Sequence, residues 1–296
     1  MTTGTARGMT TRSLPGVLRT VRRPLRAAPR ILRIGALILA VVVVASVIGR
    51  SVLPDPNEQD LLNVLAAPSP SHPFGTDELG RDVLSRTLAA IWLDLGFGIG
   101  AAFLSVAIGV TVGSAAGFAG GMVERIVMRF VDAVIAFPLL VFVLAVVAML
   151  GPGIKSLLIA IVSYSWALYA RFARGEMLVL REKQFFQAAQ TLGYSKRRVV
   201  LRHAIPNLMR PVAVFAASDI VLNVLAIATL SFLGLGVAPP TPEWGAIIAS
   251  GQQYVLTAWW ISTLPGAFVV VVGLGFVLIG DALGELLGVH RVALVQ

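Results

Sequence analysis

The 296-residue chain contains no cysteine, only three histidines and few charged residues. The absence of cysteine excludes disulfides, thiolate nucleophiles and cysteine-based metal sites. His72, His203 and His290 are far apart in sequence, and no pair has metal-ligand spacing, so we expect no metal centre. Charged residues make up 13% of the chain, against about 25% in soluble domains, and 57% of residues are hydrophobic. This balance predicts that lipid is the main solvent of the protein.

Motifs for nucleotide chemistry are also missing. The sequence has no Gly-x-x-x-x-Gly-Lys-Ser/Thr loop, so ATP binding by this chain is not expected. No Ser/His/Asp arrangement or carboxylate pair stands in a plausible catalytic site. We therefore predict a protein that is not an enzyme and has no cofactor of its own; any ATP and Mg would be bound by partner subunits.

Six apolar segments are candidates to cross a bilayer, whose hydrocarbon core of about 30 Å requires about 20 helical residues. In lipid every backbone polar group must be satisfied internally, which predicts helices rather than an open sheet. The expected fold class is an all-α membrane protein. The predicted spans are residues 31–49, 88–118, 131–150, 154–170, 211–235 and 261–283.

The basic residues fall mainly on one predicted side of the membrane. Of the 24 Lys and Arg residues, 20 lie in the N-terminal tail, the second and fourth connections and the C-terminal tail. The positive-inside rule makes that side, with both termini, cytoplasmic. The prediction is a basic tail over residues 1–30 and a transmembrane domain over 31–290, with outer loops 50–87 and 236–260. This topology accounts for the net charge of +9 without a nucleic-acid groove.

Three glycines in the second predicted span, Gly109, Gly113 and Gly117, recur at every fourth residue. Small residues at this spacing lie near one helix face and allow helix backbones to approach closely in lipid. Packing within this subunit is the favoured interpretation, and contact with a second membrane subunit is the alternative.

The long cytoplasmic loop, residues 171–210, has the pattern of a helix, a glycine turn and a second helix. An apolar stripe with helical spacing contains Phe185, Ala188, Ala189 and Leu192. Gly193 suits the left-handed residue that ends a helix, and Pro206 is expected to interrupt the chain before the fifth span. The stripe must be buried against headgroups, against its own bundle or against a partner protein.

This loop also resembles a known signature of transport proteins. Gln187-Ala188-Ala189, then three residues, Gly193, nine residues and His203-Ala204-Ile205-Pro206, resembles the EAA loop of ABC importer permeases. The resemblance implies a coupling helix that docks into a cleft on a separate ATP-binding subunit. The chain departs from the pattern at Gln187, where Glu is usual, and at Ile205, where Leu is usual. A DNA-binding helix-turn-helix is the rival interpretation, but a segment tethered at both ends to a bilayer has no room to reach a major groove.

Three further segments resemble the dipeptide and oligopeptide branch of that family, with type I architecture. They are residues 72–82, Asp132-Ala133 with Phe137-Pro138, and residues 232–245. The resemblance implies a second permease subunit, two ATP-binding subunits, an extracytoplasmic substrate-binding protein and a peptide substrate. A nickel importer of the same family is the alternative in cargo. An ion-driven secondary transporter and a membrane-embedded enzyme are the alternatives in class, although neither an internal repeat nor paired catalytic residues are evident.

Acidic residues dominate the predicted outer loops, and five residues there are candidates for the binding-protein side: Asp77, Glu78, Asp82, Glu243 and Trp244. These acids are expected to pair with a basic rim on that protein. Anchoring of a short helix at the membrane surface is the alternative role for the tryptophans.

Ionisable residues inside a membrane span are usually turned inward. Asp219 and Asn223 are one helical turn apart in the fifth predicted span, so both can line a translocation pathway. Pairing between helices is the alternative. Asp94 and Asp132 lie near span ends and are expected to reach water.

Overall fold

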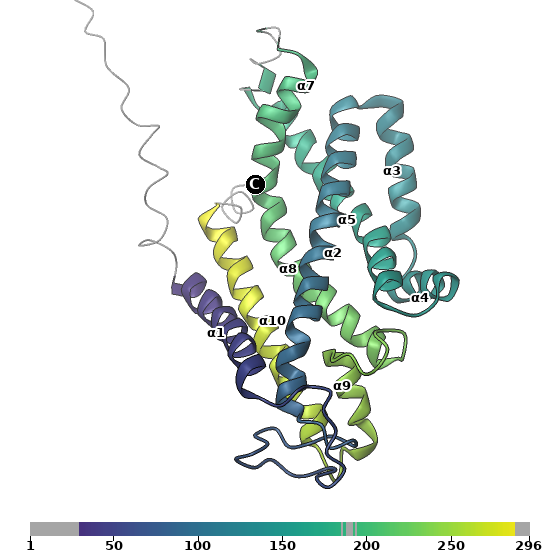
Figure 1. Cartoon of the computed structure of the whole chain (residues 1–296). Coiled ribbons are helices and arrows are strands. Elements are labelled where there is room, and N and C mark those ends of the chain that lie inside the picture. The colour runs from purple at the N-terminus through teal and green to yellow at the C-terminus, as the bar shows by residue number, and fades with distance from the viewer. Residues whose placement is uncertain (1–29, 185, 188–191, 193, 288–296) are drawn as a thin grey trace, which may run out of the picture.

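The computed structural model describes residues 30–184, 186, 187, 192 and 194–287. These residues form an elongated bundle of helices without a strand (Figure 1), so the predicted all-α class is confirmed. Five helical segments are long and apolar enough to cross a membrane. They are α1 (Arg30–Val52), α2 (Val83–Ala119), α5 (Ile154–Glu182), the turn η1 (Val200–Ala204) continued by α8 (Ile205–Phe232), and α10 (Trp260–Leu286).

The third predicted span, residues 131–150, is not one straight helix. It falls on α3 (Gly121–Ile135) and α4 (Leu139–Leu150), whose axes are bent by 88°. Pro138 stands at the break with φ of −60°. Proline has no N–H to donate and disfavours helical geometry in the residue before it, so the helix ends there. The bundle therefore has six spans only if this bent pair is counted as one.

The glycine repeat of α2 packs against α5 within the subunit, as favoured from the sequence. A Cβ at Gly113 would collide with the backbone carbonyl of Ala170, and a Cβ at Gly109 would collide with Trp166 and Tyr169. The two helix backbones are therefore in direct contact over this stretch, a close approach that small residues make possible.

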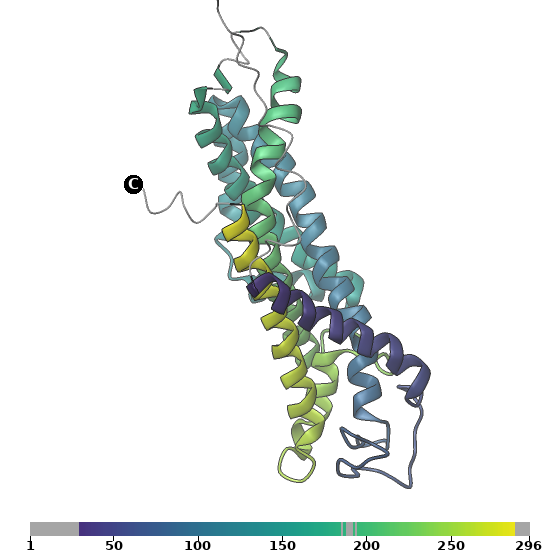
Figure 2. The ribbon, with the colours of Figure 1, turned by 90° about the vertical axis from the view of Figure 1, so that its left-hand side faces the viewer.

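Helix α1 lies on the outside of the bundle, where it crosses α10 (Figures 1 and 2). The contact is close, because a Cβ at Gly35 would lie 2.8 Å from the carbonyl oxygen of Gly275. The opposite face of α1 carries exposed apolar side chains such as Leu37 and Val41, with 64% and 58% of their surface accessible. This face suits a hydrocarbon environment.

Two connecting regions lie at opposite ends of the bundle (Figure 1). We call residues 53–82 and 236–259 the cap; they include α9 (Trp244–Ser250) and the turn η2 (Gln252–Tyr254). We call residues 183–204 the hairpin; they include α7 (Lys196–Val199) and η1. The first cap segment is joined to the starts of α10 and α2, since Trp260 donates to the carbonyl of Thr76 at 3.1 Å and Ser85 donates to that of Pro54 at 2.6 Å.

Candidate functional site

The hairpin begins later than the sequence indicated. The loop was expected from residue 171, but α5 continues to Glu182. A hydropathy pattern marks where a helix leaves the apolar core, and it does not mark where the helix itself ends. Three arginines hold this polar extension to its neighbours. Arg171 pairs with Asp132 and Arg174 with Glu124 of α3, both at 2.5 Å, and Arg181 donates to the carbonyl of Gly117 in α2 at 2.9 Å.

Phe186 anchors the hairpin to the bundle. Its side chain has no accessible surface and packs in a cluster with residues of α5 and α8, among them Met177 and Leu208. Its ring also meets that of Phe118 in α2, with ring centroids 6.1 Å apart. The sequence pattern selected its neighbour Phe185 for the apolar stripe and missed Phe186, since two adjacent phenylalanines cannot be ranked by periodicity alone.

The second half of the hairpin is built on a stack of rings. Tyr194 lies parallel to His203 with centroids 6.2 Å apart, and the guanidinium of Arg198 lies 5.0 Å from the centre of the tyrosine ring. Nε2 of His203 is buried and has no hydrogen-bond partner among the described residues. The stack therefore joins Tyr194, at the start of this half, to His203 in η1.

Pro206 does not interrupt the chain as expected. It lies in the first turn of α8, where a missing N–H is tolerated, and the π-helical turn η1 runs directly into that helix. Helical structure therefore extends from Lys196 to Phe232.

Four of the predicted hairpin residues, Phe185, Ala188, Ala189 and Gly193, lie outside the described residues. Of the others, Gln187 is exposed, and its side-chain amide lies 3.5 Å from the carbonyl of Glu182. Leu192 has 73% of its surface accessible and Leu201 has 52%. These two leucines leave apolar surface on the hairpin that the bundle does not cover.

A polar cluster lies inside the bundle where α5 meets α8. The hydroxyl of Tyr169 donates to Oδ2 of Asp219 at 2.9 Å, and the amide of Asn223 donates to the same oxygen at 3.2 Å. All three side chains are buried. Within this subunit, then, Asp219 pairs between helices, which was one of its two predicted roles.

A second buried charge cluster holds the cap together. Asp77, predicted to face outward, is 1% exposed and pairs with Arg81 at 2.6 Å, while Arg86 lies 3.7 Å from the same oxygen. Arg86 also donates to the carbonyl of Pro56 at 2.9 Å. Glu78, which is partly exposed, adds a bond to Arg81 at 3.2 Å.

The remaining predicted binding-protein residues are helix caps or core. Asp82 accepts from the N–H of Ser85 at the start of α2, and His72 lies 2.9 Å from its second oxygen. Glu243 is fully buried and accepts two backbone N–H groups at the start of α9. Burial raises the pKa of Glu243. Trp244 is fully buried too, and its ring N–H donates to Thr87 at 2.9 Å.

These positions are at odds with three sequence-based expectations. Asp77, Asp82 and Glu243 cannot pair with a basic rim on another protein while they are buried here, and Trp244 is not a surface anchor. Asp94 does not reach water either, because it has no exposed surface and accepts from the N–H of Trp244. The sequence shows each charge but not its partner, which lies far away along the chain. Asp132, by contrast, is exposed and paired with Arg171, which agrees with the expectation that it reaches water.

One exposed stretch of the cap is residues 57–64, which we call its tip; all of them except Asp60 are exposed. Glu58 is exposed there, and Leu61 and Leu62 have 70% and 96% of their surface accessible. Among the described residues, no group of three or more His, Asp or Glu side chains could hold a metal ion.

The amino-acid sequence matches a protein family described as "Binding-protein-dependent transport system inner membrane component" over residues 109–288. The chain is 38% identical to the "Probable D,D-dipeptide transport system permease protein DdpC" of Escherichia coli K12, with 79% of this chain and 78% of that protein covered. It is also 38% identical to the "Glutathione transport system permease protein GsiD" of Escherichia coli O6:K15:H31, with 85% and 84% covered.

A third relative is a "Putative peptide transport system permease protein" of Brucella suis biovar 1, which is 37% identical with 92% of this chain and 91% of that protein covered. Among solved structures, an amino acid ABC transporter is 17% identical and covers 71% of this chain and 94% of its own, with a TM-score of 0.49. The similarity that identifies the family is therefore that of the sequences.

Proposed function

Because this chain belongs to the family of binding-protein-dependent transport system inner membrane components, a group of multi-pass proteins of the bacterial inner membrane, we propose that it is the permease subunit of an ATP-driven importer of di- and oligopeptides. It forms the translocation pathway with a second permease subunit. Two ATP-binding subunits, which carry the ATP and Mg, dock on its hairpin from the cytoplasm. An extracytoplasmic binding protein delivers the peptide.

The hairpin is the observation that carries this proposal. It is anchored through Phe186 to helices α2, α5 and α8 at once, so a force applied to it reaches three spans. Its uncovered leucines, Leu192 and Leu201, supply apolar surface for a partner. When the ATP-binding subunits close on ATP, they can therefore move the bundle between a state open to the cytoplasm and a state open to the outside. This is a two-state change driven by different contacts in the two states.

The peptide cargo is supported by the names of the relatives, which are permeases for dipeptides, glutathione and peptides. Nickel remains the alternative within the family. The binding protein is proposed to meet the exposed tip of the cap, in place of the buried acids. Glu58 and Leu62 offer a charge and apolar surface there.

The absence of cysteine permits a direct test of this arrangement. A single Leu192→Cys variant is expected to react with a membrane-impermeant thiol reagent only from the cytoplasmic face, since the side chain is exposed on the hairpin. It is also expected to cross-link to a co-expressed ATP-binding subunit. Labelling in right-side-out and inside-out vesicles, followed by gel analysis of the cross-linked pair, measures both.

Leu62→Cys is the matched control, because Leu62 is also an exposed leucine but lies on the cap at the opposite end. It is expected to be labelled from the other face and to give no cross-link to the ATP-binding subunit. Labelling of Leu192→Cys from outside would contradict the proposed orientation. Labelling from inside without any cross-link would contradict the docking.

Asp219 is proposed to lie beside the translocation pathway. Asp219→Ala is expected to reduce peptide uptake at least tenfold while the subunit still accumulates and assembles, because an inward-facing carboxylate in a membrane span is retained for function. Uptake of a labelled dipeptide, with permease content measured by immunoblot, tests this.

Tyr169→Phe is the matched control, since it removes only the hydrogen bond between α5 and α8. A bond of this kind contributes about 0.6 kcal/mol on average in membrane bundles, so the effect on uptake is expected to be small. Equal losses of uptake in both variants would assign Asp219 a packing role. Normal uptake in Asp219→Ala would show that Asp219 has no role in the pathway.

A further inference from the structure

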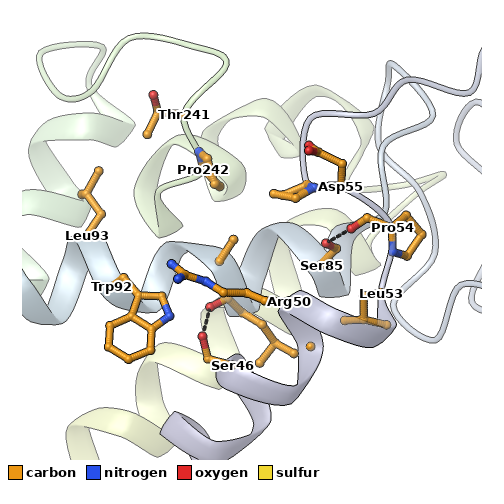
Figure 3. A pocket seen from close by; sticks show the side chains of 14 residues that line it. Ser46, Arg50, Leu53, Pro54, Asp55, Ser85, Trp92, Leu93, Thr241 and Pro242 are labelled. Atoms are coloured by element: carbon orange, nitrogen blue, oxygen red, sulfur yellow. Dashed lines mark hydrogen bonds between the residues drawn. The ribbon is translucent and has the colours of Figure 1, made fainter.

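A cavity of about 550 Å³ lies where α1 ends, between that end, the start of α2 and the loop that leads to α9. Its volume is within the range of about 300–1,000 Å³ that small-molecule sites occupy. Figure 3 shows side chains that line it. The polar ones are Ser46, Arg50, Asp55, Ser85 and Thr241, and Trp92 is the aromatic one.

Arg50 brings a positive charge to this cavity. Its guanidinium lies 5.1 Å from the centre of the Trp92 ring, and no carboxylate in the described part of the chain forms an ion pair with it. A ring under the guanidinium orients the group without neutralising its charge. The planar fork of an arginine matches the oxygens of a phosphate in two parallel hydrogen bonds.

Arg50 stands at the end of the apolar stretch of α1, next to the cap. Arg33 and Arg50 bracket an uncharged apolar stretch that measures about 26 Å along the helix axis at ~1.5 Å per residue. Basic side chains at the ends of such a stretch reach toward the lipid headgroups. Trp92, 44% exposed beside it, has the amphipathic ring that is enriched at this depth.

Asp55 supplies a negative charge to the same cavity, at the start of the cap. Its residue is exposed, and Oδ1 accepts the backbone N–H of Asn57 at 2.7 Å, which fixes the direction of the carboxylate. Arg50 and Asp55 are not paired with each other, and both lie around the cavity in Figure 3. One cation and one anion on the wall of a cavity complement a zwitterion.

An apolar stripe on α2 leads away from the cavity. Trp92, Gly96 and Ile99 are exposed at helical spacing, and nothing lies within 4 Å of a Cβ added at Gly96. A phospholipid continues from its headgroup into acyl chains that need such a surface, whereas a short peptide does not. We infer that the cavity binds the headgroup of a phosphatidylethanolamine lipid, with its phosphate on Arg50 and its ammonium at Asp55.

The full chain, extracted from the membrane in a mild detergent and examined by native mass spectrometry, tests this inference. Titration with short-chain phosphatidylethanolamine is expected to show one saturable site. Arg50→Gln is expected to weaken this binding at least tenfold, and Asp55→Asn to weaken it several-fold. Trp92→Leu, which keeps an apolar side chain but removes the ring that orients Arg50, is expected to weaken it about fivefold.

Lys155→Gln is the matched control, because Lys155 is an exposed cation in the first turn of α5 and does not line the cavity. It is expected to bind phosphatidylethanolamine as the unaltered chain does. Phosphatidylglycerol, which has a phosphate but no ammonium, is expected to bind more weakly to the unaltered chain and to be insensitive to Asp55→Asn.

Equal binding by Arg50→Gln and Lys155→Gln would overturn the inference. If Arg50→Gln does not accumulate, unchanged binding by Trp92→Leu would overturn it instead. Phosphatidylglycerol binding as tightly as phosphatidylethanolamine would overturn the assignment of the ammonium to Asp55. Displacement of the lipid by a dipeptide at the same site would show that the occupant is a peptide. The lipid site does not depend on the proposed import function, since binding is measured without transport.

Discussion

Gly113→Ala is expected to prevent stable accumulation of the subunit. The added methyl group collides with the backbone carbonyl of Ala170, and neither helix backbone can move aside without separating α2 from α5. Overpacking of a core typically costs about 1–3 kcal/mol, and a clash with backbone rather than with a flexible side chain lies at the upper end. Membrane content by immunoblot and the temperature of aggregation in detergent measure the loss.

Gly100→Ala is the matched control for this prediction. Gly100 lies on the same helix, and nothing is found within 4 Å of a Cβ added there. Replacement of a helical glycine by alanine in open space is neutral or stabilising by up to about 1 kcal/mol, because alanine loses less conformational freedom on folding. The two substitutions are chemically identical, so stability changes of opposite sign would show that the contact between α2 and α5 causes the loss in Gly113→Ala. Equal accumulation of both variants would contradict the close packing of α2 and α5.

Phe186→Ala is expected to abolish peptide uptake while leaving the subunit in the membrane. The ring is fully buried between α2, α5 and α8, and removal of a buried phenylalanine side chain costs about 3–5 kcal/mol. That loss falls on the attachment of the hairpin, since the ring joins the hairpin to the three helices. Uptake of labelled dipeptide is expected to fall more than tenfold.

The readouts for Phe186→Ala separate lost coupling from lost folding. Permease content and co-purification of the second permease subunit are expected to persist, whereas stimulation of ATP hydrolysis by loaded binding protein is expected to disappear in proteoliposomes. Phe186→Leu keeps most of the apolar volume and is expected to retain most of the uptake. Unchanged uptake in Phe186→Ala would mean that the hairpin is positioned by other contacts.

The glycine repeat was readable from the sequence because it depends on local spacing. Gly109 and Gly113 fall on one helix face at any tertiary arrangement, and the structure packs both against α5. The turn predicted at Gly193 lies outside the described residues and stays a prediction. The same logic failed at Pro206. The proline rule predicted a break at Pro206, but helical structure is continuous there, because the π-helical turn η1 runs directly into the first turn of α8, which contains the proline.

The burial and the partners of the charged residues in the cap could not be predicted from the sequence. Asp77 and Glu243 were correctly located outside the apolar spans, yet their surroundings were not foreseen. The backbone N–H of Trp244, the residue after Glu243, donates to Asp94, which is 150 positions earlier in the chain. Arg86 similarly meets the carbonyls of Pro56 and Pro240. A count of charges on one side of a membrane cannot tell a surface acid from one that is buried with its partner.

By itself the sequence determined the solvent of this protein and its class. Long apolar runs with few charges require lipid, and their backbone polar groups require helices. Only the tertiary structure decided which acids are buried, that Phe186 holds the hairpin, and that Arg50 and Asp55 share a cavity. The reason is physical: membrane insertion and helix formation depend on residues close together in the chain, whereas burial and ion pairing depend on contacts between helices that no local pattern records.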